Sequence, residues 1–111
     1  MTRIEKEKTC EDIERMIKMC VGCCGKTASD YYIGITTVPE RRLQEHNVDI
    51  ETNCGWLFRA ENETAAREVE KNFTVDAVQG WRMRGDQGGG TGDDGDVYYV
   101  YCYLVTTDTI Q

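Results

Sequence analysis

Residues 97–105, VYYVYCYLV, carry the strongest strand signal in this chain, because β-branched and aromatic side chains favour extended backbone. Side chains alternate between the two faces of a strand, so three tyrosines are predicted to share one face: Tyr99, Tyr101 and Tyr103. Residues 31–36 and 55–60 are shorter segments of the same kind. Gly34 interrupts the first of them, and we expect another group to come close to the backbone there.

Helical spacing separates these strands. Over residues 10–24 the apolar residues recur every three or four positions, with Thr9 placed to cap the first turn and Gly25 to end the helix. A second, short helix is predicted to start from a capping box at Thr37 and to run to about His46.

A third helix is predicted to follow Asn62, whose side chain is a favoured N-cap. Ala66, Val69 and Phe73 mark its buried stripe. The polar residues 25–30 between the first helix and the first strand are expected to form a turn.

Together these elements predict a single α+β domain over residues 1–111, with a small, mainly antiparallel three-stranded sheet flanked by about three helices. Alternating strands and helices also suggest a parallel doubly wound sheet, but three short strands argue against it. Residues 1–8 alternate charges without a core pattern and are expected to fray. The expected core contains Ile13, Ile17, Ile33, Ile35, Leu43, Trp56, Phe58, Val69, Phe73, Val100 and Leu104.

The charge and hydropathy of the chain exclude several classes of protein. The net charge is -7, from 13 Lys and Arg against 20 Asp and Glu, so the chain lacks the basic surface that holds nucleic acid by charge alone. No apolar run approaches the ~18 residues that a membrane span needs. The N-terminus lacks an apolar signal segment. We therefore expect an intracellular, cytoplasmic protein with no membrane partner.

Six cysteines stand at positions 10, 20, 23, 24, 54 and 102. In a reducing compartment they are expected to be free thiols, several of them small buried hydrophobes. Cys20 and Cys23 form a C-x-x-C pair, but no second close pair completes a zinc site, so the sequence argues against zinc. A zinc- or redox-linked module built on this pair and Cys24 stays open as a third function.

Residues 80–96 contain seven glycines and four aspartates, which predicts a flexible or tightly turned loop. The segment lacks the strand, turn and helix of a phosphate-binding P-loop. Its aspartates also lack the spacing of a calcium-binding loop: Asp86, Asp93, Asp94 and Asp96. We interpret the segment as a solvated acidic loop.

Two features point to chemistry. Glu70 lies on the apolar stripe of the third helix, where a carboxylate is costly unless it is paired, bound to a metal or opened to a cleft. Arg42 and His46 are four residues apart, so they share one helix face and can reach one phosphate. A guanidinium makes bidentate contacts with phosphate oxygens, and one carboxylate with phosphate oxygens and water is a common way to hold Mg²⁺.

The segments YYIGITTVPERRLQEH and WLFRAENETAAREVEKNF resemble, in order and spacing, those of the GIY-YIG nuclease family. The resemblance implies that Tyr32 and Gly34 are the tyrosine and glycine of the family's Tyr-Ile-Gly motif. Arg42 and His46 match the helix arginine and a histidine that some members carry one turn later. Glu70 matches the glutamate that holds a divalent cation.

This resemblance, which spans residues 31–73, implies metal-dependent hydrolysis of phosphodiester bonds in nucleic acid, with Mg²⁺ or Mn²⁺ as the cofactor. In the family, water is the nucleophile, a tyrosine helps to take its proton and an arginine neutralises the phosphate. The site residues it implies are Tyr32, Arg42, His46 and Glu70 for catalysis, Glu70 for metal, and Gly34 and Arg41 for substrate binding. We expect the four catalytic side chains to line one cleft, with room for a phosphate above Tyr32, next to Gly34.

The chain departs from the family pattern before residue 31, where no Gly-Ile-Tyr tripeptide occurs. Residues 97–105 are the best candidate to replace the family's first strand, and either Tyr99 or Tyr101 would then supply its tyrosine. The family's downstream asparagine is not placed by the sequence.

A second function fits the acidic charge. A catalytically silent module with the same fold would bind or inhibit a nucleic-acid-binding protein by presenting carboxylates where phosphates would lie. The site residues have structural alternatives as well. In these alternatives, Tyr32 simply packs in the sheet and Arg42 and His46 form a solvated helix face. Glu70 would then pair with Arg59 or Arg42.

Overall fold

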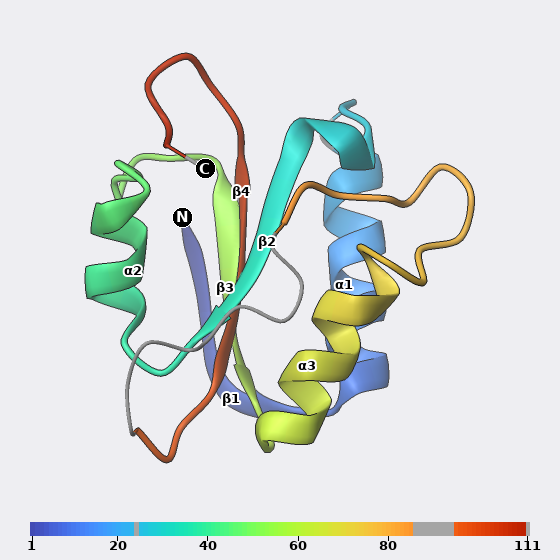
Figure 1. Ribbon diagram of the computed structural model, residues 1–111, viewed down its shortest axis with the longest axis vertical. Coiled ribbons are helices and arrows are strands. Elements are labelled where there is room, and N and C mark those ends of the chain that lie inside the picture. The colour runs from blue at the N-terminus through green and yellow to red at the C-terminus, as the bar shows by residue number, and fades with distance from the viewer. Residues whose placement is uncertain (24, 86–94, 111) are drawn as a thin grey trace.

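The structure is a computed structural model that describes residues 1–23, 25–85 and 95–110. Its sheet has four strands in the order β1-β3-β4-β2: β1 (Thr2–Lys8), β2 (Tyr31–Thr36), β3 (Gly55–Ala60) and β4 (Tyr99–Leu104). β1 runs parallel to β3, and the other two pairings are antiparallel (Figure 1). The α+β class is confirmed, whereas the expected three-stranded sheet is wrong because a fourth strand joins one edge.

That additional strand is β1, in residues that the sequence suggested would fray. Most of its side chains are exposed, so no alternating apolar pattern marks it. Backbone pairing with β3 holds it, with Thr2 opposite Trp56 and Ile4 opposite Phe58. Ile4 also packs against the core. Charged side chains on such an edge strand discourage pairing with another chain.

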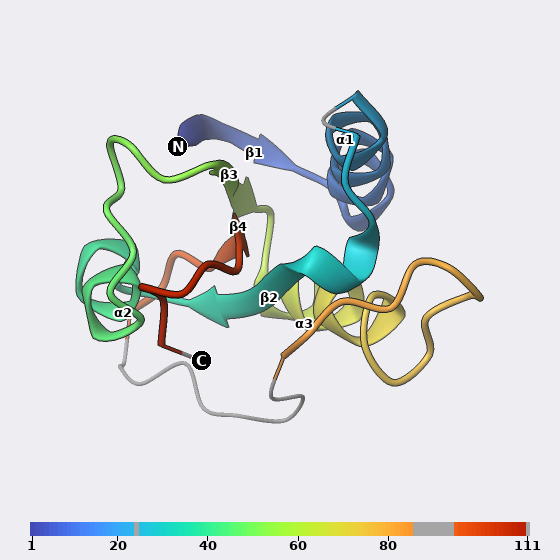
Figure 2. The same cartoon turned by 90° about the horizontal axis from the view of Figure 1, so that it is seen from above.

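In the part of the chain that the structure describes, three α-helices cover the two faces of the sheet. α1 (Cys10–Cys23) and α3 (Glu63–Asn72) lie on one face, and α2 (Pro39–Glu45) lies on the other (Figures 1 and 2). Two predicted caps are confirmed: the Asp12 amide donates to Thr9 Oγ1 at 3.2 Å, and the Ala65 amide donates to Asn62 Oδ1 at 2.8 Å.

The start of α2 differs from the prediction. Val38, not Thr37, is the N-cap of this helix, and its side chain makes no capping hydrogen bond. The Val38 amide donates instead to Thr36 Oγ1 at 3.0 Å, because β2 extends to Thr36 and the turn follows directly. A short 3-10 helix, Ala28–Asp30, lies within the residues expected to form a polar turn before β2.

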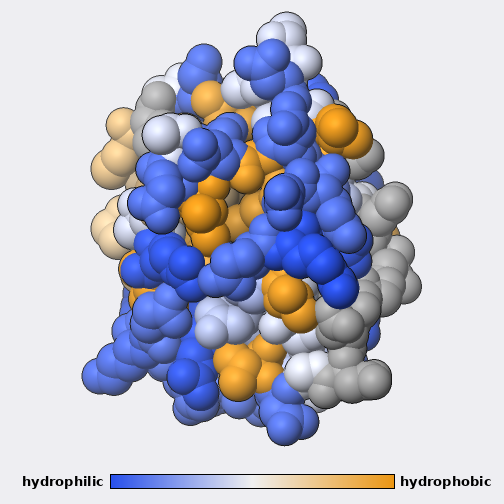
Figure 3. Space-filling model, turned by 90° about the vertical axis from the view of Figure 1, so that its left-hand side faces the viewer, coloured by the Kyte–Doolittle hydropathy of each residue, from blue (hydrophilic) through white to orange (hydrophobic). Residues whose placement is uncertain are grey.

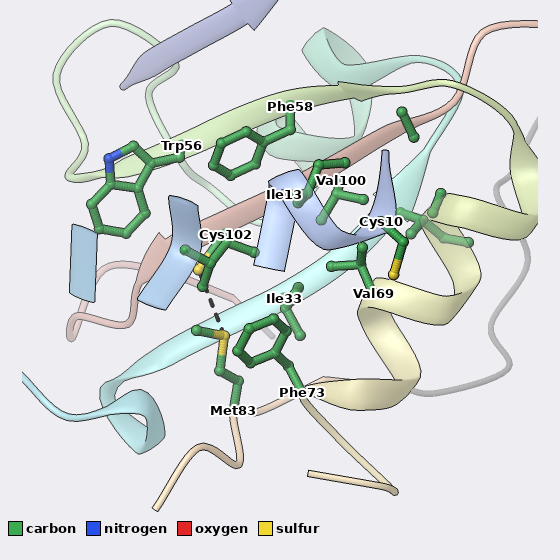
Figure 4. Close-up of a cluster of buried hydrophobic side chains, with 14 of the residues drawn as sticks. Cys10, Ile13, Ile33, Trp56, Phe58, Val69, Phe73, Met83, Val100 and Cys102 are labelled. Carbon is green, nitrogen blue, oxygen red and sulfur yellow. Dashed lines mark hydrogen bonds between the residues drawn. The ribbon is translucent and has the colours of Figure 1, made fainter. Parts of the chain in front are cut away.

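The larger hydrophobic cluster fills the space between the sheet and the α1–α3 layer (Figure 4). Cys102 Sγ contacts Met83 Sδ there at 3.7 Å. Every residue expected in the core is buried except Leu104, which is partly buried against this cluster. A smaller cluster lies on the α2 face and consists of Tyr32, Leu43, Val48, Leu57, Tyr101 and Tyr103.

The described cysteines are free thiols: Cys10, Cys20, Cys23, Cys54 and Cys102. Cys24, which belonged to the proposed zinc or redox module, lies outside the described residues. None of the described helices is long and apolar enough to cross a membrane.

The start of the glycine-rich segment covers the open edge of β2. The Arg84 amide donates to the Tyr31 carbonyl at 2.9 Å, and the Ile33 amide donates to the Arg84 carbonyl at 2.8 Å. Residues 86–94, with three of the four aspartates considered for calcium, lie outside the described residues.

Candidate functional site

Tyr101 is the residue around which the predicted site gathers. The register of β2 and β4 places it opposite Gly34, and a Cβ at position 34 would collide with its hydroxyl oxygen and its Cζ. The space expected to receive a phosphate is therefore filled by the Tyr101 ring. The same register pairs Tyr99 with Thr36, further along β2, so only Tyr101 lies against the motif glycine.

His46, at the C-terminal end of α2, holds Tyr101 in place. Its Nε2 lies 3.1 Å from the Tyr101 hydroxyl. Its Nδ1 lies 2.5 Å from the Ile110 carbonyl oxygen and 3.0 Å from the Tyr103 hydroxyl. A carbonyl oxygen only accepts hydrogen bonds, so Nδ1 carries the hydrogen. In the neutral ring Nε2 is then an acceptor, and the Tyr101 hydroxyl donates to it.

Tyr32 completes an aromatic group with these residues. Its ring lies 4.9 Å from the His46 ring and 5.4 Å from the Tyr103 ring, centroid to centroid. The Tyr101 and Tyr103 rings stack at 6.2 Å. Tyr32 and His46 are thus brought together as the sequence suggested, but both are buried, as is Tyr101.

Arg42 precedes His46 by one helical turn, and the two adjacent arginines of α2 differ in position. The Arg42 side chain is 30% exposed and pairs with Glu45 at 3.4 Å. Its charge acts on the Tyr101 phenol. The Arg41 side chain is 50% exposed and lies 3.9 Å from Glu45, on the surface of α2. Arg42, rather than Arg41, therefore belongs to the surroundings of Tyr101.

Glu70 approaches from the other side of the sheet. It lies on α3, whose buried residues pack in the cluster opposite α2, and only 5% of it is exposed. Its negative charge nevertheless acts on the Tyr101 phenol. The charges of Glu70 and Arg42, which come from helices on opposite faces of the sheet, thus both act on Tyr101. The structure also argues against an ion pair between Glu70 and Arg59, because Arg59 pairs with Glu7 at 3.3 Å.

An open pocket of about 690 Å³ lies beside α3. Its lining mixes acidic, basic and amide side chains: Thr64, Arg67, Glu68, Glu70, Lys71, Asn72 and Asp76. Glu70 therefore opens to a hollow although it lies on the apolar stripe of its helix, one of the arrangements that make a buried carboxylate tolerable.

Burial governs the protonation of the tyrosines in this group. Burial raises the pKa of Tyr101, the Arg42 charge opposes this rise and the Glu70 charge adds to it. Burial also raises the pKa of Tyr103. Both phenols are therefore protonated at neutral pH and act as hydrogen-bond donors.

A single carboxylate at Glu70 fits a magnesium-type cation. Within residues 1–23, 25–85 and 95–110, no three His, Cys, Asp or Glu side chains are grouped to hold a metal ion. Mg²⁺, however, usually keeps several waters and takes only one or two carboxylates together with substrate phosphates. The open pocket beside Glu70 leaves room for such a hydrated ion.

Sequence reasoning missed two partners of His46, namely Tyr103 and the Ile110 carbonyl. The alternation of residues 97–105 places Tyr103 on the same face as Tyr101, and this pattern could have identified Tyr103 as a second partner of His46. The contact with Ile110 has no sequence signal, because it uses a backbone oxygen that the chain beyond β4 brings back to α2.

The molecular face that carries α2 is mainly hydrophilic, with apolar residues visible between the polar ones near its centre (Figure 3).

Comparisons with protein-family models, curated proteins and solved structures found no match to this chain.

Proposed function

We propose that this protein is a divalent-metal-dependent nuclease that hydrolyses phosphodiester bonds, as the resemblance to the GIY-YIG family implies. The surroundings of Tyr101 support the proposal. Gly34 makes room for its ring, His46 accepts from its hydroxyl, and the charges of Arg42 and Glu70 act on its phenol. A phenol, an imidazole, a cation and a carboxylate gathered from separate elements are a typical catalytic set.

The reaction is an attack of water on phosphorus, in which the new O–P bond forms as the bond to the leaving oxygen breaks. The partly exposed Arg42 guanidinium neutralises phosphate charge. Because the Tyr101 phenol is protonated, its oxygen takes the proton of water only as its own proton passes to His46 Nε2. The leaving oxygen takes a proton from solvent. A metal ion held by Glu70 would supply Lewis-acid polarisation of the phosphate.

Substitution of Glu70 tests the proposal. Glu70→Gln removes the metal-binding charge and keeps the size of the side chain. We expect the cleavage of single- or double-stranded DNA or RNA with Mg²⁺ or Mn²⁺ to fall by about a hundredfold or more, equivalent to several kcal/mol of barrier. The matched control is Glu61→Gln, an exposed residue just before α3 and outside this pocket, which should retain full activity.

Thermal unfolding separates catalysis from stability in this experiment. If Glu70→Gln lowers the melting temperature and leaves cleavage by the folded fraction intact, Glu70 is structural and the metal assignment is wrong. Wild-type protein that cleaves none of the four substrates contradicts the nuclease proposal as a whole.

The burial of the aromatic group and the net charge of -7 favour the acidic interaction module as the second candidate. Tyr101 and His46 are 3% and 9% exposed, so little of either is open to a phosphate. An acidic surface also repels the nucleic-acid backbone.

The two candidates differ in the partner that they bind. The module is expected to bind an Arg- and Lys-rich peptide with an affinity that weakens as salt rises, and to bind neither DNA nor RNA. Titration calorimetry with that peptide and with an oligonucleotide in Mg²⁺ separates them. Binding or cleavage of the oligonucleotide excludes the module.

A further inference from the structure

Residues 106–110, which we name the C-terminal strap, return from β4 to the end of α2. The Thr106 amide donates to Thr109 Oγ1 at 3.1 Å, which fixes the turn. The Ile110 amide then donates to the His46 carbonyl at 2.7 Å. The Asn47 side-chain amide donates to the Asp108 carbonyl, also at 2.7 Å. One backbone and one side-chain hydrogen bond thus tie the strap to the end of α2.

The strap also determines which nitrogen of His46 carries the hydrogen. The Ile110 carbonyl faces Nδ1 at 2.5 Å, and the Tyr103 hydroxyl donates to the same carbonyl at 3.4 Å. The opposite tautomer would turn the Nδ1 lone pair toward the oxygen lone pairs of Ile110, which is repulsive. It would also place a hydrogen on Nε2, where the Tyr101 hydroxyl now donates.

We propose that the C-terminal strap is a positioning device that holds His46 in the Nδ1–H tautomer, so that Nε2 serves as the proton acceptor of Tyr101. The role of the strap in catalysis rests on the proposed nuclease function. The tautomer itself is a property of the folded chain and exists with or without that function. Ile110 and Asn47 are positioning residues, because they act only through His46 and the strap.

The ring nitrogens of His46 report the tautomer directly by nitrogen-15 NMR. His46 is the only histidine of the chain, so its two ring nitrogens give a single pair of signals. In the full chain at neutral pH we expect the hydrogen on Nδ1 and an acceptor-type signal from Nε2. A chain ending at Val105 keeps β4 but loses the strap, and its Nδ1–H preference is expected to disappear.

Asn47→Gly loosens the strap without shortening the chain. Asn47 has a φ of 55°, a conformation that glycine adopts freely, so the backbone is preserved and only the amide contact with Asp108 is lost. We expect a mixture of tautomers and a fall in cleavage of about tenfold or more. The matched control is Asn53→Ala, which removes the side-chain oxygen that accepts from the Asp49 backbone amide in a loop outside the strap.

Each result decides the proposal. A full chain with the hydrogen on Nε2, or an Asn47→Gly variant with an unchanged tautomer, overturns it, whether or not the shortened chain folds. If the tautomer responds but the wild-type protein cleaves no nucleic acid, the strap assignment stands and the nuclease function fails. If the protein cleaves and the tautomer is indifferent to Asn47→Gly, the strap assignment alone fails.

Discussion

Gly34 on β2 and Tyr101 on β4 lie directly opposite each other on neighbouring strands, and the phenol ring of Tyr101 fills the volume that any side chain at position 34 would need. The glycine does not have a positive φ, so its role here is to admit the ring. The ring in turn reaches His46 through its hydroxyl. The glycine of the Tyr-Ile-Gly sequence is therefore a packing requirement of the tyrosine opposite it.

Gly34→Ala is expected to destabilise the protein, because the new methyl group displaces Tyr101 from His46. Overpacking of this kind costs about 1–3 kcal/mol, which chemical denaturation measures as a lower free energy of unfolding. Gly22→Ala is the control, since a Cβ at that helical position meets nothing within 4 Å. It should be neutral or stabilising by up to about 1 kcal/mol. Equal stability of Gly34→Ala and wild type would disprove the packing argument.

Tyr101→Phe should affect both stability and cleavage, whereas Tyr99→Phe should affect neither strongly. Without the Tyr101 hydroxyl, the buried Nε2 of His46 loses its donor, at a cost of about 1–3 kcal/mol. If the proton relay operates, kcat falls by about a hundredfold or more. Tyr99 is only partly buried and opposes Thr36, so its change is the matched control. A larger loss of activity in Tyr99→Phe would show that the wrong tyrosine was chosen.

The protein should lose stability at alkaline pH. Burial raises the pKa of the Cys102 thiol, and burial together with the Glu14 carboxylate raises the pKa of the Cys10 thiol. In the unfolded chain both thiols ionise near their ordinary value of about 8.5. Above that pH the unfolded state releases protons that the folded state keeps, so the free energy of unfolding falls as pH rises.

Denaturant titrations between about pH 7 and about pH 10, under reducing conditions, measure this loss. Each thiol contributes at most about 1.4 kcal/mol per pH unit. The stability that these groups supply is complete below about pH 8.5 and decreases above it. Cys102→Ala should give a shallower decline than wild type. An identical decline would mean that Cys102 ionises in the folded protein.

Asn62→Ala should lower the free energy of unfolding by about 1 kcal/mol, because the Ala65 amide loses its cap at the start of α3. Asn62→Asp keeps an acceptor oxygen and places a negative charge at a helix N-terminus, so it should preserve stability. The pair is compared by thermal unfolding. Equal losses in both variants would assign the effect to something other than capping.

Most of the fold could be predicted, because elements that bury side chains show a recognisable spacing of apolar residues in the sequence. β2 and β4 are rich in aromatic and β-branched residues, and α1 and α3 show a clear apolar stripe. β1 escaped prediction because backbone pairing with β3, rather than side-chain burial, defines it. A strand held in this way leaves no alternation in the sequence.

The candidate site was predictable only in part. Tyr32, Arg42 and His46 are close in sequence, and helix and strand geometry alone place them near one another. The choice of Tyr101 over Tyr99 depends on the register between β2 and β4, which two alternating strands do not specify by themselves. Glu70 lies in the opposite layer because its helix packs with α1, and this assignment of layers follows from the complete sheet order.

The position of β4 has a consequence for the nascent chain. Among the strands of the described sheet, β4 comes last in the sequence, yet it lies between β3 and β2 and supplies both antiparallel pairings. Until Leu104 has left the ribosome, only the parallel pair of β1 and β3 has its partner available. The apolar faces of β2 and β3 lack this partner until β4 is made, and exposed apolar surface and unpaired strand edges of this kind make an emerging polypeptide prone to aggregation.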